Sequence, residues 1–196
     1  MKREKWLIVG LGNPEGAYFN TWHNLGFVVA EGVATHLGVD FKKKGNMLIA
    51  DCSVDGGVVY VQKPLTYMNR SGEAVVALKR KTGIKTGNII VLVDELYLDK
   101  GKIRIVRGGG GGGHNGTRSI TELVGSSEYI RIKIGIKPQR EVASTSNYVL
   151  SRIPEDERAH ISEAVQKATQ ATLEIVQGAD LGAVQTKYNS KNEVKS

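Results

Sequence analysis

An apolar run at residues 6–10, followed by a long polar loop and a helical pattern, constrains the fold more than any other stretch. The run, WLIVG in one-letter code, has no charged side chain, which is typical of a strand buried on both faces. Residues 27–37 are mostly apolar and precede Gly38, which favours a helix that ends at a glycine. The loop of residues 11–26 therefore joins a buried strand to a helix, and ligands bind at such strand ends in open α/β sheets.

The rest of the chain continues this alternation of strands and helices. Asp55-Gly56-Gly57 is a turn signal between two strand patterns, so one hairpin is expected there. Strands are predicted at 47–53, 58–62, 89–93, 103–106 and 130–136, and helices at 71–82, from a cap at Asn115, and from Pro154 to Gly178. The pattern predicts a single α/β domain over residues 1–188, with a mixed twisted β-sheet and helices on both faces, and a mobile tail at 189–196.

Composition narrows the class of protein. The chain has 196 residues, 40% of them hydrophobic, which is enough for one domain with a buried core. It holds a single cysteine, which excludes an internal disulfide framework. Residues 1–6 are charged and lack the apolar stretch of a signal peptide, and no run approaches the length of a membrane span. We expect a cytoplasmic protein that does not bind membranes.

The chain is basic, with a formal net charge of +7 and a sequence pI near 9.4. Lysines and arginines recur on many separate segments, including residues 42–44, 79–81 and 100–107. Such a charge distribution favours a polyanionic partner, above all a nucleic acid. Arg104, Arg107 and Arg131 are predicted to contribute to that binding.

Four loops at the expected strand ends carry polar side chains that can converge on one site. His23 lies in the first loop and Asp94 directly follows the strand at 89–93. An imidazole can take a proton from water, and a neighbouring carboxylate fixes its tautomer, so this pair indicates hydrolysis without a metal. The neutral amides that can hold a carbonyl group or an oxyanion are those of Asn13, Asn69 and Asn115. His114, after the glycine run of residues 108–113, is a candidate for contacting an RNA phosphate.

A dinucleotide-binding site is excluded by two details of the first loop. Gly10 and Gly12 after a strand, with Glu31 further on, imitate the fingerprint of such a site. Glu15, however, stands where the third glycine is needed, and no helix opens there to receive a pyrophosphate. A nicotinamide-dependent oxidoreductase is therefore rejected.

Six short motifs occur in a fixed order between residues 6 and 188. They are Gly10-Leu11-Gly12-Asn13-Pro14 with Tyr18 and Thr21-x-His23-Asn24-x-Gly26, Pro64-x-Thr66-x-Met68-Asn69-x-Ser71-Gly72, Asp94-Glu95-Leu96, Gly112-Gly113-His114-Asn115-Gly116, Arg131-x-Lys133-Ile134-Gly135-Ile136, and Tyr148-Val149-Leu150. In these motifs the chain resembles the bacterial peptidyl-tRNA hydrolases.

The resemblance implies hydrolysis of the ester between a peptide and the 3′ end of tRNA, by a cofactor-free monomer. It implies that His23 is the catalytic base and Asp94 its partner, and that Tyr18 lies at the tRNA end. The residues implied to hold the peptide and the 3′-terminal ribose region are Asn13, Met68, Asn69 and Asn115.

Two of the departures from the family pattern, at Trp22 and Tyr97, leave a second function open. Trp22 stands where an arginine usually precedes the histidine, which either weakens a charge contact or replaces it with stacking on a base or ribose. Glu15 delays the glycine of the Asn-Pro-Gly opening by one place, and Tyr97 replaces a second acidic residue. The alternative is a non-catalytic RNA-binding factor on the same fold, although such a factor has no need of His23 and Asp94 together.

Overall fold

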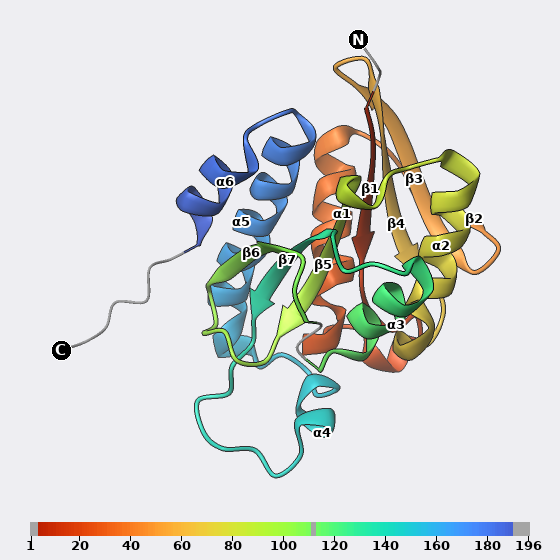
Figure 1. Ribbon diagram of the computed structural model, residues 1–196. Coiled ribbons are helices and arrows are strands. Elements are labelled where there is room, and N and C mark those ends of the chain that lie inside the picture. The colour runs from red at the N-terminus through yellow and green to blue at the C-terminus, as the bar shows by residue number, and fades with distance from the viewer. Residues whose placement is uncertain (1–3, 111–112, 190–196) are drawn as a thin grey trace.

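A seven-stranded mixed sheet forms the centre of the computed structural model, which describes residues 4–110 and 113–189 (Figure 1). The strands are β1 (Lys5–Gly10), β2 (Lys42–Lys44), β3 (Met47–Val54), β4 (Gly57–Pro64), β5 (Ile89–Glu95), β6 (Ile103–Arg107) and β7 (Ile130–Gly135). They lie in the order β2-β3-β4-β1-β5-β7-β6. The four central strands, β4, β1, β5 and β7, run parallel, so their carboxyl ends meet at one edge of the sheet.

Helices cover both faces of this sheet, which confirms the predicted architecture (Figure 1). They are α1 (Leu25–Leu37), α2 (Ser71–Thr82), α3 (Asn115–Val124), α4 (Thr145–Val149), α5 (Arg158–Val176) and α6 (Leu181–Tyr188). Helices α1 and α5 enclose one apolar cluster with Ile8 and Ile90, whereas α2 and α3 enclose another with Leu7 and Val91. Neighbouring strand residues thus point to opposite faces, and both faces are buried.

Several element boundaries agree with the prediction because glycine stops the helices. Gly38 and Gly83 follow α1 and α2 with positive φ values of 67° and 70°, as expected at a helix C-terminus. Neither helix α6 nor the short strand β2 was predicted. Strand β2 consists of three lysines, which give no strand pattern, and it pairs with β3 at the edge of the sheet.

The predicted cap of α3 was wrong by one residue. Asn115 is the first residue of the helix, and the cap is His114, whose ring nitrogen accepts a hydrogen bond from the backbone N–H of Gly116. Histidine is an uncommon cap, so the propensity of asparagine was misleading here. Asp94 and Glu95 are likewise the last residues of β5 and do not follow it.

The glycine run begins far from the carboxyl edge of the sheet because β6 is antiparallel to β7. Arg107 pairs with Ile130 at the start of β7, whereas Ile103 pairs with Ile134 near its end. The run that follows β6 therefore begins at the edge opposite the carboxyl ends, whereas His114 lies beside Asp94 at the carboxyl edge. Residues 111–112 of the run lie outside the described residues.

Asn189 lies against β6, although it was expected to begin the mobile tail. Its side-chain amide accepts from the backbone N–H of Ile105 at 2.6 Å and donates to the carbonyl of Ile105 at 2.9 Å. Residues 190–196 of the predicted tail lie outside the described residues. In the described ranges, no helix combines the length and the apolar character that crossing a membrane requires.

Two glycines let α1 approach the end of β1. A Cβ atom on Gly26 would lie 2.3 Å from the carbonyl oxygen of Leu92 and 2.5 Å from the backbone nitrogen of Leu11. A Cβ atom on Gly10 would lie 2.4 Å from the carbonyl oxygen of Gly26. The backbone N–H of Phe27 donates to the carbonyl of Leu11, so the loop of residues 12–26 is closed at its base.

We predict that Gly26→Ala destabilises the protein by about 1–3 kcal/mol, since the new methyl group meets backbone atoms that cannot move aside. This loss should outweigh the higher helix propensity of alanine. Urea denaturation measures the effect, with Gly16→Ala as control, because nothing lies within 4 Å of a Cβ atom there. Equal stability of the two variants would contradict the prediction.

Candidate active site

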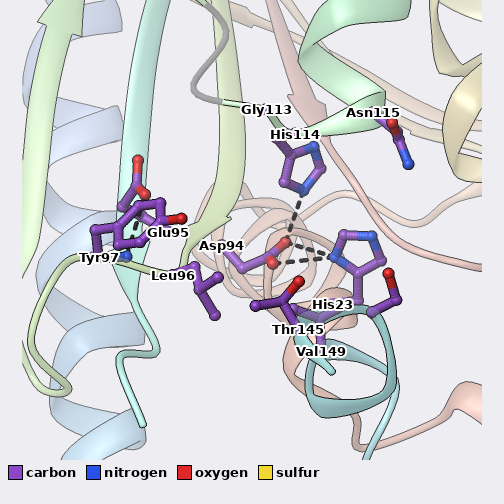
Figure 2. A pocket seen from close by; sticks show the side chains of 11 residues that line it. His23, Asp94, Glu95, Leu96, Tyr97, Gly113, His114, Asn115, Thr145 and Val149 are labelled. Carbon is purple, nitrogen blue, oxygen red and sulfur yellow. Dashed lines mark hydrogen bonds and ion pairs between the residues drawn. The ribbon is translucent and has the colours of Figure 1, made fainter. Parts of the chain in front are cut away.

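A buried carboxylate lies between two histidines at the carboxyl edge of the sheet (Figure 2). Asp94 is the penultimate residue of the central strand β5 and is 5% exposed. The Nδ1 atom of His23 lies 3.0 Å from each of its oxygens. The Nε2 atom of His114 lies 2.9 Å from Oδ1. Three segments far apart in the sequence are thus joined through one side chain.

The hydrogen bonds fix which ring nitrogen carries a proton. Nδ1 of His114 accepts from the N–H of Gly116 at 3.1 Å, so its Nε2 carries the proton that is donated to Asp94. Nδ1 of His23 faces both carboxylate oxygens and therefore donates to them. Nε2 of neutral His23 is then left without a proton, which is the state that a general base needs.

Asp94 is held in its charged form by the two imidazoles. Burial alone disfavours the charge, but the electrostatic attraction of His114 and His23 and their hydrogen bonds outweigh it. The pKa of the Asp94 carboxyl consequently lies well below its usual range. The carboxylate can therefore stabilise a positive charge that develops on His23.

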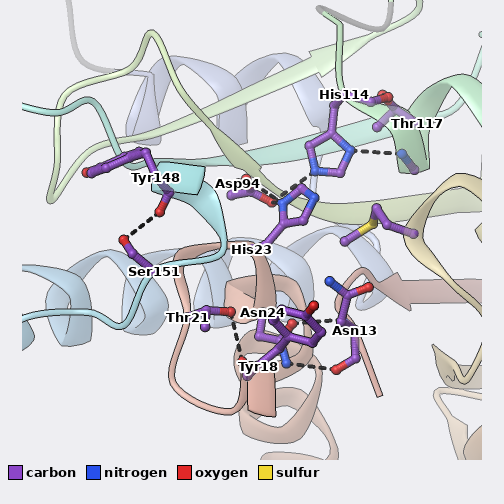
Figure 3. A network of polar contacts seen from close by, with 12 residues as sticks. Asn13, Tyr18, Thr21, His23, Asn24, Asp94, His114, Thr117, Tyr148 and Ser151 are labelled. Atoms are coloured by element: carbon purple, nitrogen blue, oxygen red, sulfur yellow. Dashed lines mark hydrogen bonds and ion pairs between the residues drawn. The ribbon is translucent and has the colours of Figure 1, made fainter. Parts of the chain in front are cut away.

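Asn24 positions Asn13, which comes from the first loop (Figure 3). Its side-chain oxygen accepts from the backbone N–H of Asn13 at 2.7 Å, and its side-chain nitrogen donates to the carbonyl of Asn13 at 3.0 Å. Asn24 is only 6% exposed, so it shapes the loop and leaves the side chain of Asn13 to face the site. The family motif already contained Asn24, but only the structure gives it this supporting position.

Two adjoining hollows meet at His23. The first is lined by Glu95, Leu96, Tyr97, Gly113, His114 and Thr145, together with Asp94. The second is lined by Asn13, Pro14, Glu15, Tyr18, Tyr67, Met68, Asn69 and Leu150. His23, Asn115, Ser146 and Val149 line both. The side chains predicted from four loops thus converge, with His23 at the junction of the two hollows.

Asn115 is further oriented by its own helix. Its side-chain oxygen accepts from a guanidinium nitrogen of Arg118 at 2.9 Å, which directs its side-chain N–H groups elsewhere. Met68 is 6% exposed and Asn69 is exposed, so the base of the second hollow is apolar and its rim is polar.

Two residues lie elsewhere than expected. Arg131 is 2% exposed, and its guanidinium donates to the carbonyls of Gly108, Gly109 and Gly110, so it anchors the glycine run. Trp22 is 1% exposed and lies in the core, which excludes the expected stacking on a base or ribose. The sequence around Arg131 and around Trp22 was ambiguous, because a short motif does not show whether a side chain is buried.

His114 is engaged through both ring nitrogens, with Asp94 and with Gly116. It therefore contributes to the order of the site. Tyr97 is 78% exposed at the rim of the first hollow, and its backbone N–H donates to Glu95.

Within residues 4–110 and 113–189, one group of three, His23, Asp94 and His114, brings possible metal ligands within 4.8 Å of one another. Nδ1 of His23 and Nε2 of His114 each lie at hydrogen-bond distance from a carboxylate oxygen of Asp94. An ion midway between such a nitrogen and oxygen would lie about 1.5 Å from both atoms, closer than the ~2 Å of a zinc–ligand bond. Both rings would have to turn to hold a metal, and the present geometry is that of hydrogen bonds.

The fold and the site first define a class: an α/β protein with a histidine held by a buried carboxylate at the carboxyl edge of its sheet, an arrangement found in hydrolases. The family described as peptidyl-tRNA hydrolase matches residues 7–196. The chain is 40% identical over 191 residues to the peptidyl-tRNA hydrolase of Clostridium acetobutylicum, covering 97% of this chain and 99% of the relative. It is 36% identical over 187 residues to that of Syntrophotalea carbinolica, covering 94% and 97%.

A solved structure agrees with these sequence matches. The crystal structure of peptidyl-tRNA hydrolase from Acinetobacter baumannii superposes with a TM-score of 0.88 at 34% identity, over 94% of both chains. The chain therefore belongs to the peptidyl-tRNA hydrolase family, a family of hydrolases.

We predict that Asp94→Asn flattens the loss of stability in acid. A carboxyl whose folded pKa is lowered stabilises the fold above its unfolded pKa of about 4, and this contribution is lost as the pH falls further. Between pH 5 and 3 the free energy of unfolding of the unsubstituted protein should fall more steeply than that of the variant, by up to about 1.4 kcal/mol per pH unit. Urea denaturation at each pH checks this, with Asp51→Asn as an exposed control. Parallel curves for Asp94→Asn and the unsubstituted protein would refute it.

Proposed function

We propose that this protein hydrolyses the ester between peptide and tRNA in peptidyl-tRNA that has left the ribosome, and so recycles the tRNA. The observation that carries the proposal is the position of His23. Its Nδ1 is fixed by Asp94, so Nε2 is the free acceptor, and the ring lies where the two hollows join. An ester placed across this junction has room for a different group on either side.

In the proposed mechanism His23 acts as general base. Nε2 takes a proton from a water molecule, and the water oxygen attacks the ester carbonyl carbon. Asp94 stabilises the imidazolium that forms. The tetrahedral intermediate then collapses, the ribose oxygen leaves with the proton returned by His23, and the products are free tRNA and a peptide with a carboxyl terminus.

Neutral amides around His23 hold the substrate in this proposal. They stay uncharged at any pH, so they can donate hydrogen bonds to the developing oxyanion without gaining or losing a proton themselves. The residues proposed to hold the peptide and the 3′-terminal ribose are Asn13, Met68, Asn69 and Asn115. Tyr18, which lines the same hollow as Met68, is proposed to contact the tRNA end.

The tRNA body is proposed to bind through exposed basic side chains. Arg104 and Arg107 are exposed on β6, a strand at the edge of the sheet. Contacts to phosphates carry no sequence information, which suits an enzyme that must accept every tRNA. We propose that the protein acts in the cytoplasm as a monomer without a cofactor. A non-catalytic RNA-binding factor is less consistent with the site, since binding alone does not need the paired His23 and Asp94.

We predict that His23→Ala lowers kcat by about 10²- to 10⁴-fold, the usual contribution of a positioned general base, while tRNA binding stays within about twofold. Release of free tRNA from an N-acetylated aminoacyl-tRNA measures turnover, and filter binding measures affinity. His36→Ala is the control, because His36 is exposed on α1 away from both hollows. Near-normal turnover of His23→Ala would overturn the mechanism, and tight tRNA binding without turnover by the unsubstituted protein would favour the RNA-binding factor.

We predict that Arg104→Gln and Arg107→Gln weaken tRNA binding and flatten its dependence on salt. Each lost phosphate contact should reduce the slope of log K against log salt by about 0.7–0.9. Arg131→Gln should leave the slope unchanged, because its guanidinium is buried beneath the glycine run. Binding is measured between about 50 and 200 mM salt, and unchanged slopes for Arg104→Gln and Arg107→Gln would remove both from the RNA footprint.

A further inference from the structure

Trp22 lies directly before His23, in a short 3-10 helix, and is 1% exposed. Its side chain contacts two segments that are distant in sequence: α4, and the connection between β5 and β6. Both segments also contribute walls to the hollows. Its indole thus connects the loop that carries His23 to two segments that form walls of the site.

The first contact of Trp22 is with α4. Its ring stacks on that of Tyr148, with centroids 5.5 Å apart and planes inclined by 23°. The hydroxyl of Tyr148 donates to the carbonyl of Ile136 at 2.7 Å, just beyond the end of β7. Burial, and secondarily the charge of Glu157, raises the pKa of Tyr148 to about 12, so the hydroxyl remains a neutral donor. The ring of Tyr148 is held at both ends.

The second contact of Trp22 is with Lys100. The ammonium lies 4.9 Å from the centre of the indole ring and forms an ion pair with Glu157 at 2.5 Å. The two charged side chains are only 13% and 15% exposed, so the pair is partly shielded from water. A cation over an aromatic face is attracted by its electrons, and more strongly when it is desolvated. This contact ties the connection that begins with Leu96 and Tyr97 to the same indole.

One side of helix α4 faces the two hollows and the other packs against the core. Ser146 and Val149 line both hollows, whereas the ring of Tyr148 points away from His23 toward the core (Figure 3). The helix has only five residues, too few to be stable without tertiary contacts. Backbone bonds anchor its far end, from Trp22 to Ser151 and from Ile153 to Asn20. The side-chain contacts that hold the helix itself include the stack of Tyr148 with Trp22 and the bond of the Tyr148 hydroxyl to Ile136.

We infer that Trp22 is a positioning residue that sets the wall of the substrate cleft by holding α4, through Tyr148, at a fixed distance from His23. It touches no reacting atom, and the hydrogen bonds of Asp94 with His23 and His114 are made without it. The inference rests on the proposed function, since it concerns the binding of that substrate. It assigns to Trp22 an effect on substrate affinity and none on the chemical step.

The test compares Trp22→Leu and Tyr148→Leu with Trp22→Phe, which keeps an aromatic face. The matched control is Trp6→Leu, because Trp6 is a partly buried tryptophan packed against the same core cluster and lines neither hollow. Two quantities are measured: KM and kcat on N-acetylated aminoacyl-tRNA, and the Kd of the same molecule with an amide in place of the ester. The amide analogue reports binding whether or not the protein cleaves the ester.

Trp22→Leu and Tyr148→Leu should each raise KM and the analogue Kd by about five- to tenfold, with kcat and its pH profile within about twofold. The effects of the two substitutions should be clearly less than additive in the double variant, because both remove the stack that the two rings share. Trp22→Phe and Trp6→Leu should stay within about twofold of the unsubstituted protein.

An unchanged Kd in Trp22→Leu would overturn the inference, as would an equal rise in Trp6→Leu, which would show a general loss of stability. A fall in kcat without a rise in KM would also overturn it. If the unsubstituted protein binds the analogue but leaves the ester intact, the proposed hydrolysis fails, while the contrast in Kd still decides the role of Trp22.

Discussion

The site depends on one buried carboxylate that stays charged. Asp94 is supplied by the central strand β5, whose position is fixed by pairing with β1 and β7. Removing a carboxylate from water is costly unless partners replace the water, and here two imidazole N–H groups do so. The loops that carry these imidazoles are thereby drawn to the same point. The carboxylate acts as an electrostatic partner and also as the element that assembles the site.

The parallel arrangement of the central strands explains why the remaining side chains arrive at this point. Loops that follow β1 and β4 leave the sheet at the edge where Asp94 lies. The α3 segment is different, since it follows an antiparallel strand and reaches the edge only after the glycine run. Arg131 bonds three carbonyls of that run from below, so a buried guanidinium stabilises a stretch that glycine leaves conformationally free. Glycines have no side chains with which to make such hydrogen bonds among themselves.

Much of the fold and of the site could be predicted from the sequence because local signals carried them. The apolar strands, the glycine stops after α1 and α2, and the pairing of His23 with Asp94 all have short-range or motif signatures. The role of His114 could not be predicted in the same way, since its hydrogen bond with Asp94 joins two segments that only folding brings together. Trp22 and Arg131 were misread for a related reason: an aromatic or basic residue in a motif reads as a nucleic-acid contact until its burial is known.

The second histidine also bears on the direction of proton transfer. A carboxylate that accepts hydrogen bonds from both His23 and His114 has less affinity for a proton than one that accepts from His23 alone. Asp94 therefore favours the imidazolium of His23 by its charge without taking the proton from it. In the proposed reaction the proton then remains on His23 until the ribose oxygen departs, and it is available to that oxygen at the moment when negative charge develops there. In that reaction the hydrogen bond from His114 keeps the proton on His23 rather than on Asp94, so that His23 can donate it to the ribose oxygen.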